Sequence, residues 1–338
     1  MTKVRFGIVG VGNFGLMHIQ TLKQLPEAEL VAVCCRTEDR LKLVCKEYNI
    51  PKWYTDIDAL VNDADIDVLI VATGEDTHYS FTEKAIRAGK HVLLEKPICL
   101  NVEDGKKLLA LDQSTGLHIL PGHILRYDAS YNNAHRILQD EERYGEIQSI
   151  RVKRNVPVER FSLHSRTHPV FMALAHDIDI ITWLTESRVK KVCGIEKRTK
   201  EEFKSPDIVF GIAELENGVV CNLETQWRLP NEYGQYLDTE MVIMTSKGQI
   251  SLDCPGNILS SMIDGKMESY DMTLWPEVNG RLTGALVNED QHMIDLVLGR
   301  TDRQIVTVEQ AVKGIEFCQL LIQSCGSGRI VERGRTES

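Results

Sequence analysis

Short apolar runs alternate with amphipathic stretches along the first 120 residues of the chain. Near-continuous apolar runs rich in β-branched residues are typical of parallel strands covered on both faces. Between them, residues such as Met17, Thr21 and Leu25 recur at helical spacing. This alternation of strand and helix predicts a doubly wound α/β domain. Its strands are expected at residues 4–10, 30–35, 67–73, 91–95 and 117–120.

The pattern changes after about residue 122. Period-two alternation surrounds Asn217–Gly218 and Lys247–Gly248, and Asn-Gly between alternating residues is a strong hairpin signal. The second part is therefore expected to be an α+β domain with a mostly antiparallel sheet and helices on one face. We predict a boundary that gives two domains, 1–122 and 123–338. The helical patterns of this part are expected near residues 131–139, 169–185, 285–299 and 308–324.

Composition adds limits on the partners and the compartment. The chain has 338 residues, a net charge of −10 and nine cysteines without a CxxC pair. The acidic balance disfavours a nucleic-acid or anionic-membrane partner, and no apolar run reaches the roughly 18 residues of a membrane span. An odd cysteine count is typical of reduced thiols. The first residues lack a signal-peptide pattern, so we expect a cytoplasmic protein.

A glycine-rich loop follows the first expected strand. Gly10, Gly12 and Gly15 form G-x-G-x-x-G, with Asn13 and Phe14 between them. In this strand–loop–helix context the glycines allow a tight turn and a close approach to a pyrophosphate, which the helix N-terminus binds. These five residues are our candidates for binding a dinucleotide.

The end of the second strand bears on which dinucleotide binds. NAD sites usually carry a carboxylate there for the ribose 2′-hydroxyl, but this chain has Cys35, Arg36 and Thr37. Without a carboxylate to repel a 2′-phosphate, Arg36 can pair with it. We therefore predict NADP as the preferred cofactor and NAD as the alternative. The opposing interpretation makes Arg36 an ordinary solvated loop residue.

The fourth expected strand runs directly into Glu95, Lys96 and Pro97. A fixed charge pair is unusual at the end of a buried strand, because lysine is rarely buried without a partner. Ligands of open parallel sheets bind outside the carboxyl ends of the strands, which is where this pair falls. It is therefore a candidate catalytic or cofactor-binding pair, against the alternative of a structural ion pair.

Four motifs together resemble the glucose–fructose oxidoreductase and inositol dehydrogenase family. They are the glycine loop, residues 71–78, the Glu-Lys-Pro triplet at 95–97 and residues 175–184. The resemblance covers nearly the whole chain. It implies an NAD(P)-dependent oxidoreductase that transfers a hydride between nicotinamide and a sugar, polyol or related carbonyl compound. It also implies that Lys96 contacts the cofactor and the reacting substrate oxygen, as acid/base or oxyanion partner, with Glu95 orienting it.

The family's second signature is D-x-x-x-H on a helix, and the chain matches only its histidine. His176 occupies that position, while Met172 stands where the family has aspartate. Methionine exchanges no protons, so either Lys96 and His176 suffice or a neighbour such as His164, His168 or Asp177 replaces the lost group. A zinc site from His164, His168 and His176 is disfavoured because no carboxylate or cysteine spacing supports it. We expect no metal.

Further contacts are implied with less support. The same resemblance suggests Thr73, His78 and His123 as cofactor contacts and Arg126 as a substrate contact beside the cleft. In residues 154–169, Arg160 or Arg166 is a candidate for binding an anionic substrate group, against the alternative of a solvated loop.

Two rival readings of the whole chain remain open. The Met172 change also suits a cofactor-binding sensor without chemistry, or a reductase of an imine or non-sugar carbonyl. For the assembly, helices that cover one sheet face leave the other apolar, so we expect a homodimer or homotetramer through the second domain's sheet.

Overall fold

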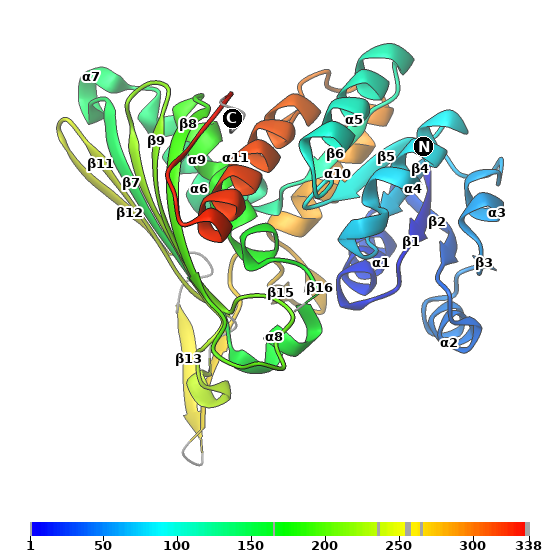
Figure 1. The fold of residues 1–338 in the computed structure, drawn as a ribbon. Coiled ribbons are helices and arrows are strands. Elements are labelled where there is room, and N and C mark those ends of the chain that lie inside the picture. Colours follow the sequence, from blue (N-terminus) through cyan, green and yellow to red (C-terminus); the bar gives the residue numbers. More distant parts are fainter. Residues whose placement is uncertain (1, 165, 235–236, 254–257, 264–265, 335–338) are drawn as a thin grey trace. The chain divides into compact units, whose positions relative to one another are not determined.

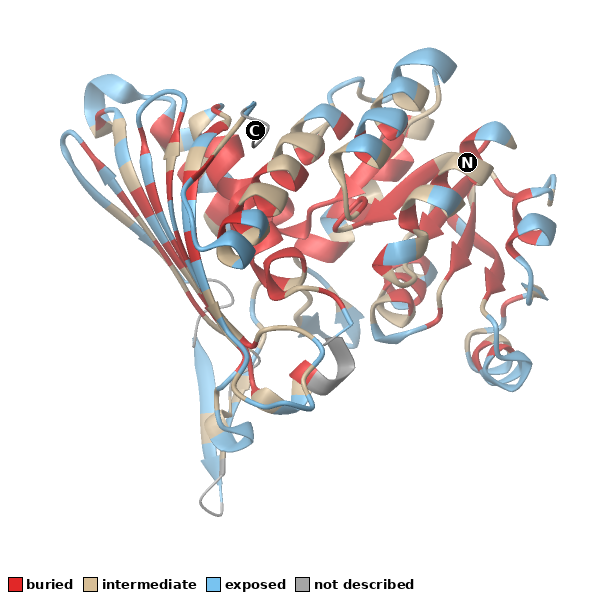
Figure 2. Cartoon of the chain, viewed as in Figure 1, coloured by how far each residue is buried: buried red, intermediate tan, exposed pale blue. Residues whose placement is uncertain are grey.

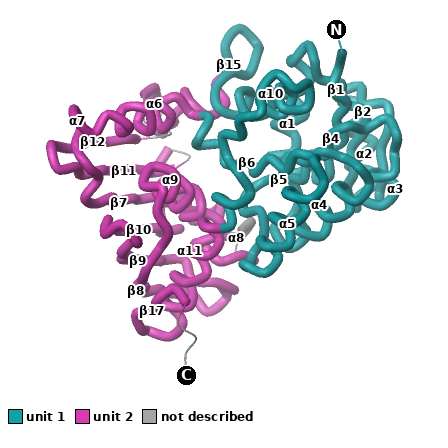
Figure 3. Tube along the Cα trace, turned by 90° about the horizontal axis from the view of Figure 1, so that it is seen from above, with its two compact units in different colours: residues 1–127, 277–312 teal, residues 128–276, 313–338 magenta. Residues whose placement is uncertain are grey.

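The computed structural model describes residues 2–164, 166–234, 237–253, 258–263 and 266–334, without the side chains of residues 162–164 and 266. Its residues group into two compact units, coloured separately in Figure 3. Unit 1 comprises residues 1–127 and 277–312, and unit 2 comprises residues 128–276 and 313–338. The return of 277–312 to unit 1 is not visible in the sequence pattern. The boundary at 122/123 between a cofactor domain and a substrate domain stays a prediction.

Unit 1 is built on a six-stranded parallel sheet of order β3-β2-β1-β4-β5-β6 (Figure 1). From β1 the strand order runs to one side of the sheet through β2 and β3 and to the other side through β4, β5 and β6. Dinucleotides bind at the switch point between β1 and β4 in such folds. The elements are β1 Val4–Val9, α1 Asn13–Gln24, β2 Ala28–Cys34, α2 Glu38–Tyr48, β3 Lys52–Tyr54, α3 Ile57–Val61, β4 Val68–Val71, α4 His78–Arg87, β5 His91–Glu95, α5 Val102–Thr115, β6 Ile119–Gly122, β15 Glu277–Val278, β16 Arg281–Leu282 and α10 Ala285–Val297.

The core of unit 1 explains why α10 belongs to it. Met293 and Ile294 of α10 are fully buried and pack into the same cluster as Phe6 and Ile8 of β1 and Leu22 of α1. Figure 2 shows the strands of this sheet buried along most of their length, as expected for strands covered on both faces. Burial of these apolar side chains brings a segment close to the end of the chain against the first helix.

Unit 2 contains a seven-stranded sheet of order β12-β11-β7-β10-β9-β8-β17. All its named pairings are antiparallel except β10 with β7, so the predicted mostly antiparallel sheet is confirmed. Both predicted hairpins are present, between β9 and β10 and between β11 and β12. The elements are α6 Ala129–Leu138, α7 Glu141–Tyr144, β7 Ile147–Asn155, α8 Val158–His164, α9 Ala175–Thr185, β8 Val189–Lys197, β9 Ile208–Leu215, β10 Val220–Gln226, β11 Asp238–Thr245, β12 Gly248–Leu252, β13 Leu259–Ile263, β14 Lys266–Tyr270, α11 Val308–Ser327 and β17 Val331–Glu332.

Helix α11 lies against one face of this sheet. A Cβ atom on Gly194 of β8 or Gly211 of β9 would press against Leu321, and the Gly194 N–H donates to Ser324 Oγ at 2.9 Å. Glycine in these strands therefore permits the close approach of helix and sheet. Within the described residues, no helix is both long and apolar enough to cross a bilayer.

Candidate active site

The glycine loop has the geometry that a dinucleotide requires. Gly10 follows β1 with φ +99°, and a Cβ atom there would overlap the Ala72 carbonyl. A Cβ atom on Gly15 would overlap the Gly10 carbonyl, whereas one on Gly12 would meet nothing within 4 Å. Gly10 and Gly15 thus fix the turn and the packing of α1, and Gly12 leaves its own side open for a ligand.

The first turn of α1 is prepared for an anion. Gly12 caps the helix without a side-chain hydrogen bond, and residues 13–16 carry no acidic group. No carboxylate in this turn neutralises the partial positive charge of the helix N-terminus, so its first N–H groups can bind a phosphate. These residues fit a dinucleotide pyrophosphate, whose nicotinamide supplies or accepts a hydride when it is bound.

Cations lie at the end of the second strand. Cys34 ends β2, and Arg36 and Thr37 follow as exposed residues before α2. The Arg40 guanidinium, on α2, donates to the Val11 carbonyl of the glycine loop at 3.4 Å. A cation that the sequence pattern did not single out therefore reaches the loop itself.

The Glu-Lys-Pro triplet begins at the buried end of β5. Glu95 is only 6% exposed, and its Oε2 accepts the Lys96 backbone N–H at 3.3 Å. Gly122 is the partner of Glu95 in the neighbouring strand β6, and a Cβ atom there would lie 2.7 Å from Glu95 Oε1. Glycine at position 122 therefore leaves the space that the buried carboxylate occupies.

His78 joins this triplet to the end of β4. Its Nδ1 lies 2.7 Å from the Pro97 carbonyl oxygen and its Nε2 lies 3.2 Å from the Thr73 carbonyl oxygen. The ring is 1% exposed, and the Thr73 hydroxyl is hydrogen-bonded to Thr77 at 2.7 Å. His78 thus lies between two loops at the carboxyl edge of the sheet, and because both partners are acceptors, a neutral ring donates to only one of the two carbonyls.

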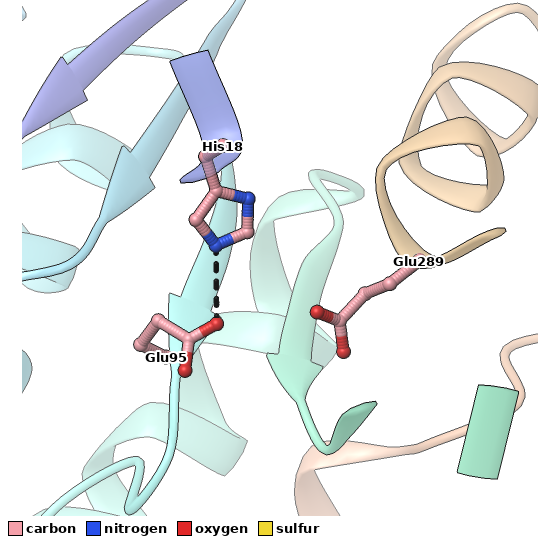
Figure 4. Close-up of side chains that lie close together, drawn as sticks. All are labelled: His18, Glu95 and Glu289. Atoms are coloured by element: carbon pink, nitrogen blue, oxygen red, sulfur yellow. Dashed lines mark hydrogen bonds and ion pairs between the residues drawn. The ribbon is translucent and has the colours of Figure 1, made fainter. Parts of the chain in front are cut away.

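Glu95 belongs to a buried polar cluster with His18 and Glu289 (Figure 4). His18 of α1 places Nε2 3.2 Å from Glu95 Oε1 and Nδ1 2.8 Å from Asp290 Oδ1 of α10. The Thr21 hydroxyl donates to the other Asp290 oxygen. Glu289 points toward His18 and Glu95, and neither of its oxygens has a hydrogen-bond partner in the described part of the chain.

Burial and charge shift two groups of this cluster. Burial by itself lowers the pKa of His18, but the Asp290 and Glu95 carboxylates outweigh it and raise that pKa well above its usual value. Burial raises the pKa of Glu289 well above the ordinary carboxyl range, and the neighbouring Glu95 carboxylate raises it further. The cluster therefore favours a charged imidazole and a neutral Glu289.

Unit 2 carries the other candidate proton-transfer group. His176 lies in the first turn of α9, directly after a π-helical turn at Val170–Leu174 that contains Met172. Met172 packs against an apolar cluster that includes Phe161 and Trp227. The position of the family's aspartate is thus part of an apolar surface here.

Two of the proposed substitutes for that aspartate have structural partners. Both Asp177 oxygens accept from the Arg154 guanidinium of β7, at 2.7 and 2.9 Å, and both residues are buried. His168 lies 2.9 Å from Glu196, and its Nδ1 accepts the Val170 N–H. The side chain of His164 lies outside the described part of the structure.

Comparisons with known proteins agree with this geometry. Residues 4–123 match the model of an oxidoreductase family with an NAD-binding Rossmann fold, and residues 132–251 match its GFO/IDH/MocA C-terminal domain. The chain belongs to this family. It is 26% identical over 302 residues to scyllo-inositol 2-dehydrogenase (NAD(+)) of Bacillus subtilis, covering 87% of this chain and 86% of that protein. Myo-inositol 2-dehydrogenase of Thermotoga maritima is 24% identical over 256 residues, covering 74% and 75%.

Solved structures show the same fold over the full length. Apo scyllo-inositol dehydrogenase from Lactobacillus casei superposes with a TM-score of 0.85 at 23% identity, covering 98% of both chains. GenD2 from gentamicin A biosynthesis, in complex with NAD, gives a TM-score of 0.84 at 20% identity, covering 99% of this chain and 97% of that one. The predicted fold class and family are confirmed, and the chain is an oxidoreductase with an NAD-binding Rossmann fold.

The structure divides the sequence-predicted site residues of this GFO/IDH/MocA chain between the units. The glycine loop, Arg36, Thr37, Thr73, His78, Glu95, Lys96, His123 and Arg126 belong to unit 1, and Arg160, Arg166 and His176 to unit 2. Their assigned roles stay predictions. Arg126 is fully buried and donates to the Ile305 carbonyl at 3.0 Å and to Gln310 Oε1 at 2.7 Å, contacts that tie it to unit 1.

Sequence reasoning missed His18, Glu289 and Asp290. One signal was available for His18, which stands three residues after Gly15 and shares the buried helix face of Ile19 and Leu22. Nothing in the local pattern pairs it with Asp290, which lies 272 residues further along the chain. The corresponding signal in helix α10 was the pair of adjacent acids, Glu289 and Asp290, which both lie on its buried side.

Proposed function

We propose that the chain is a dehydrogenase or reductase that moves a hydride between a nicotinamide and a carbon of a polyol, sugar or related carbonyl compound. The observation that carries the proposal is the position of Lys96. It directly follows the buried Glu95 at the carboxyl end of β5, on the sheet whose β1 ends in the dinucleotide loop. The names of the relatives in Bacillus subtilis and Thermotoga maritima, both inositol dehydrogenases, support a polyol substrate.

Lys96 acts on the substrate oxygen in this proposal. In the oxidation direction its neutral amine accepts the proton of the hydroxyl group that becomes a carbonyl. In the reverse direction its ammonium donates that proton and stabilises the developing alkoxide. Glu95 fixes the start of the lysine's backbone through the 3.3 Å hydrogen bond from its N–H. His176 is the second substrate-binding or proton-transfer group, and it acts without an aspartate at position 172, where this chain has Met172.

Substitution of Lys96 tests the function. The Lys96→Ala variant should lose about 10²–10⁴-fold in kcat, because alanine at position 96 cannot transfer the proton of the substrate oxygen. The assay panel contains inositols, other polyols, sugars, keto compounds and imines. Isothermal titration should show that cofactor affinity is retained, and Lys96→Arg should restore the charge but not the proton transfer. Unchanged kcat in Lys96→Ala would end the proposed role. A wild-type protein that binds cofactor and turns over no compound of the panel would favour the sensor function.

For the cofactor, we propose that NADP binds more tightly than NAD. Cys35 stands where a 2′-hydroxyl-binding carboxylate is usual, and Arg36 and Arg40 supply cations on either side of the start of α2. The name of the Bacillus subtilis relative specifies NAD(+), so preference within the family is expected to vary with these positions.

The cofactor proposal is tested by titrating both dinucleotides. Arg36→Ala and Arg40→Ala should each weaken NADP binding by roughly tenfold, because each removes one charge-assisted contact to the 2′-phosphate. NAD affinity should change little, and Arg87→Ala, which breaks an exposed pair with Glu83, serves as the control. Tighter binding of NAD than of NADP by the wild-type protein would contradict the proposal.

We also propose that the protein works in a reducing, cytoplasmic environment. Eight described cysteines are free thiols, and burial raises the pKa of Cys34, Cys99 and Cys221 to about 12. Such thiols are structural and unreactive rather than prepared for disulfide formation. Cell fractionation that recovers the protein outside the cytoplasm would contradict this assignment.

A further inference from the structure

The buried cluster around Glu95 includes groups that do not take part in the hydride transfer proposed above. It brings His18 of α1, Glu95 of β5 and Glu289 and Asp290 of α10 together within unit 1. His18, Glu289 and Asp290 are fully buried and Glu95 is 6% exposed. Three carboxyl groups around one imidazole, removed from water, need a defined distribution of protons, because isolated buried charges are strongly destabilising.

The two ring nitrogens determine the charge of His18. Each lies within hydrogen-bond distance of a carboxylate oxygen, Nδ1 of Asp290 and Nε2 of Glu95. A neutral imidazole has one N–H, so one of its lone pairs would face a carboxylate oxygen. An imidazolium donates at both nitrogens. The geometry therefore assigns a positive charge to His18 and negative charges to Glu95 and Asp290.

The remaining carboxyl group of the cluster, Glu289, is neutral. Its oxygens have no hydrogen-bond partner in the described residues, and its carboxyl group lies near the ionised Glu95. A third negative charge there would be buried without a hydrogen-bond donor among the described residues, so a proton on Glu289 is the less costly state. Burial and the Glu95 carboxylate both act in this direction on its pKa.

A metal ion fits this arrangement less well. His18, Glu95 and Glu289 present donor atoms that all lie within 4.8 Å of one another. A metal-bound histidine must be neutral and must turn a free lone pair to the ion. Both nitrogens of His18 already face carboxylates, and the imidazolium occupies the role that a bound cation would take.

We propose that His18, held as an imidazolium between Asp290 and Glu95, is a positioning residue for the Glu95–Lys96 pair, and that Glu289 is a neutral carboxylic acid beside it. This rests on the proposed role of Lys96. The positive charge of His18 offsets the negative charge of Glu95, so Glu95 orients Lys96 without holding the lysine proton too tightly for transfer. In the described part of the chain, the titratable groups close to Glu95 include His18 from α1, Lys96 beside it and Glu289 from α10, and Asp290 lies on the other nitrogen of His18.

The first experiment reads the protons directly and does not depend on activity. Infrared spectroscopy of the wild-type protein at neutral pH should show the carbonyl band of a protonated carboxyl group, and Glu289→Gln should remove it. Glu103→Gln changes an exposed carboxylate that is paired with Lys106 and should leave the band in place. Absence of the band, or its survival in Glu289→Gln, would overturn the assignment to Glu289.

The pH dependence of stability gives an independent check on the protonation of Glu289. Native Glu289 binds its proton more tightly than the unfolded chain does, so it lowers the free energy of unfolding as the pH rises above its unfolded pKa. Glu289→Gln removes this penalty. The variant should therefore gain stability relative to the wild type as the pH rises from 4 toward 8, values that span the usual carboxyl pKa of about 4.3. A difference independent of pH would count against a neutral Glu289.

The second experiment tests the positioning role through kinetics. His18→Gln keeps an N–H donor and removes the positive charge, so the pKa of Lys96 should rise. The limb of the kcat/KM profile that follows loss of the Lys96 proton should move to higher pH by about one unit. An unmoved limb would overturn the role of His18. If the variant does not fold, ¹⁵N spectra of the wild-type imidazole decide, since a single protonated ring nitrogen at neutral pH overturns the charge assignment.

Failures of the two proposals can be told apart. Full activity of Lys96→Ala would remove the catalytic role of the lysine, while the infrared result on Glu289 would still stand. Loss of activity in Lys96→Ala with an unmoved pH profile in His18→Gln would remove only the inference about His18. Elemental analysis that finds one divalent metal per chain, lost in Glu289→Gln, would replace the proton on Glu289 with a metal site.

Discussion

Two residues, Gly122 and His18, determine the space and the charge around Glu95. Gly122 has no side chain at the point where the Glu95 carboxylate lies, and His18 contacts that carboxylate with Nε2. Neither residue belongs to a recognised motif, yet both act on the residue before Lys96. A larger side chain at position 122 would displace the Glu95 carboxylate, and an uncharged one at position 18 would remove the charge beside it.

Gly122→Ala provides the prediction at this scale. Its Cβ atom would lie 2.7 Å from Glu95 Oε1, so the carboxylate must move, and its contact with His18 is disturbed. We expect a cost of roughly 1–3 kcal/mol in the free energy of unfolding. We also expect a fall in kcat that exceeds any change in cofactor affinity. Urea unfolding and steady-state kinetics measure both.

The control is another glycine without neighbours. A Cβ atom on Gly326 of α11 would meet nothing within 4 Å, so Gly326→Ala should be neutral or slightly stabilising. Wild-type stability and turnover in Gly122→Ala would show that the Glu95 carboxylate has room to move.

At the scale of elements, a buried ion pair joins β7 to α9. The Arg154 guanidinium contacts both oxygens of Asp177, and the two side chains are 3% and 2% exposed. This pair fixes the start of the helix that carries His176. It also gives Asp177 a structural role, because both of its oxygens accept from the Arg154 guanidinium.

Removal of the Asp177 carboxylate should destabilise the protein, because the Arg154 guanidinium stays buried. Asp177→Ala removes the carboxylate that binds the buried Arg154 guanidinium and should lower the free energy of unfolding by roughly 3–5 kcal/mol. Glu240→Ala breaks an exposed pair with Arg151 on the same sheet and should change the denaturation midpoint little. Equal effects of the two substitutions in chemical denaturation would refute the difference in burial as the cause.

The elements could largely be predicted from the sequence, and the exceptions have physical reasons. Parallel strands and both hairpins carry strong local signals in apolar runs and turn residues. Strand β3 has three residues, none of them buried, and lies at the sheet edge, so no apolar run marks it. Helix α10 has an ordinary amphipathic pattern that identifies a helix but not the unit it joins.

The site was predictable to the extent that its motifs are local. The glycine loop and Glu95–Lys96 are contiguous and follow strands, so their place at the carboxyl edge of the sheet follows from topology. The His18 cluster depends on contacts between α1, β5 and α10 that are far apart in sequence. Long-range pairing of this kind leaves no signature in any single stretch of the chain.

At the scale of the whole molecule, one face of the seven-stranded sheet exposes apolar side chains. Ile195 is 72% exposed and Ile212 is 58% exposed, and they lie on the neighbouring strands β8 and β9. Phe210, Val220 and Met244 are also exposed on β9, β10 and β11. A second copy of the chain that presents the same face would cover this surface, which supports the proposed homodimer or homotetramer.

A charge placed on this face should break the assembly. Ile212→Glu puts a carboxylate into the apolar surface and should reduce the mass measured by light scattering to that of a smaller species. Leu43→Glu is the matched control, because Leu43 is 65% exposed on α2 of unit 1. A wild-type protein that is monomeric at micromolar concentration, or an Ile212→Glu variant of unchanged mass, would contradict the interface.

The return of α10 to unit 1 has a consequence for the order in which the site can form. A ribosome releases the dinucleotide loop, His18 and Glu95 long before it has made Asp290 and Glu289. Until then, the imidazole of His18 lacks one of its two carboxylates, and the core formed with Met293 and Ile294 is open. Unit 1 is therefore completed by a helix that is made after residues 128–276 of unit 2. The nascent chain cannot assemble the His18 cluster before the ribosome has passed residue 290.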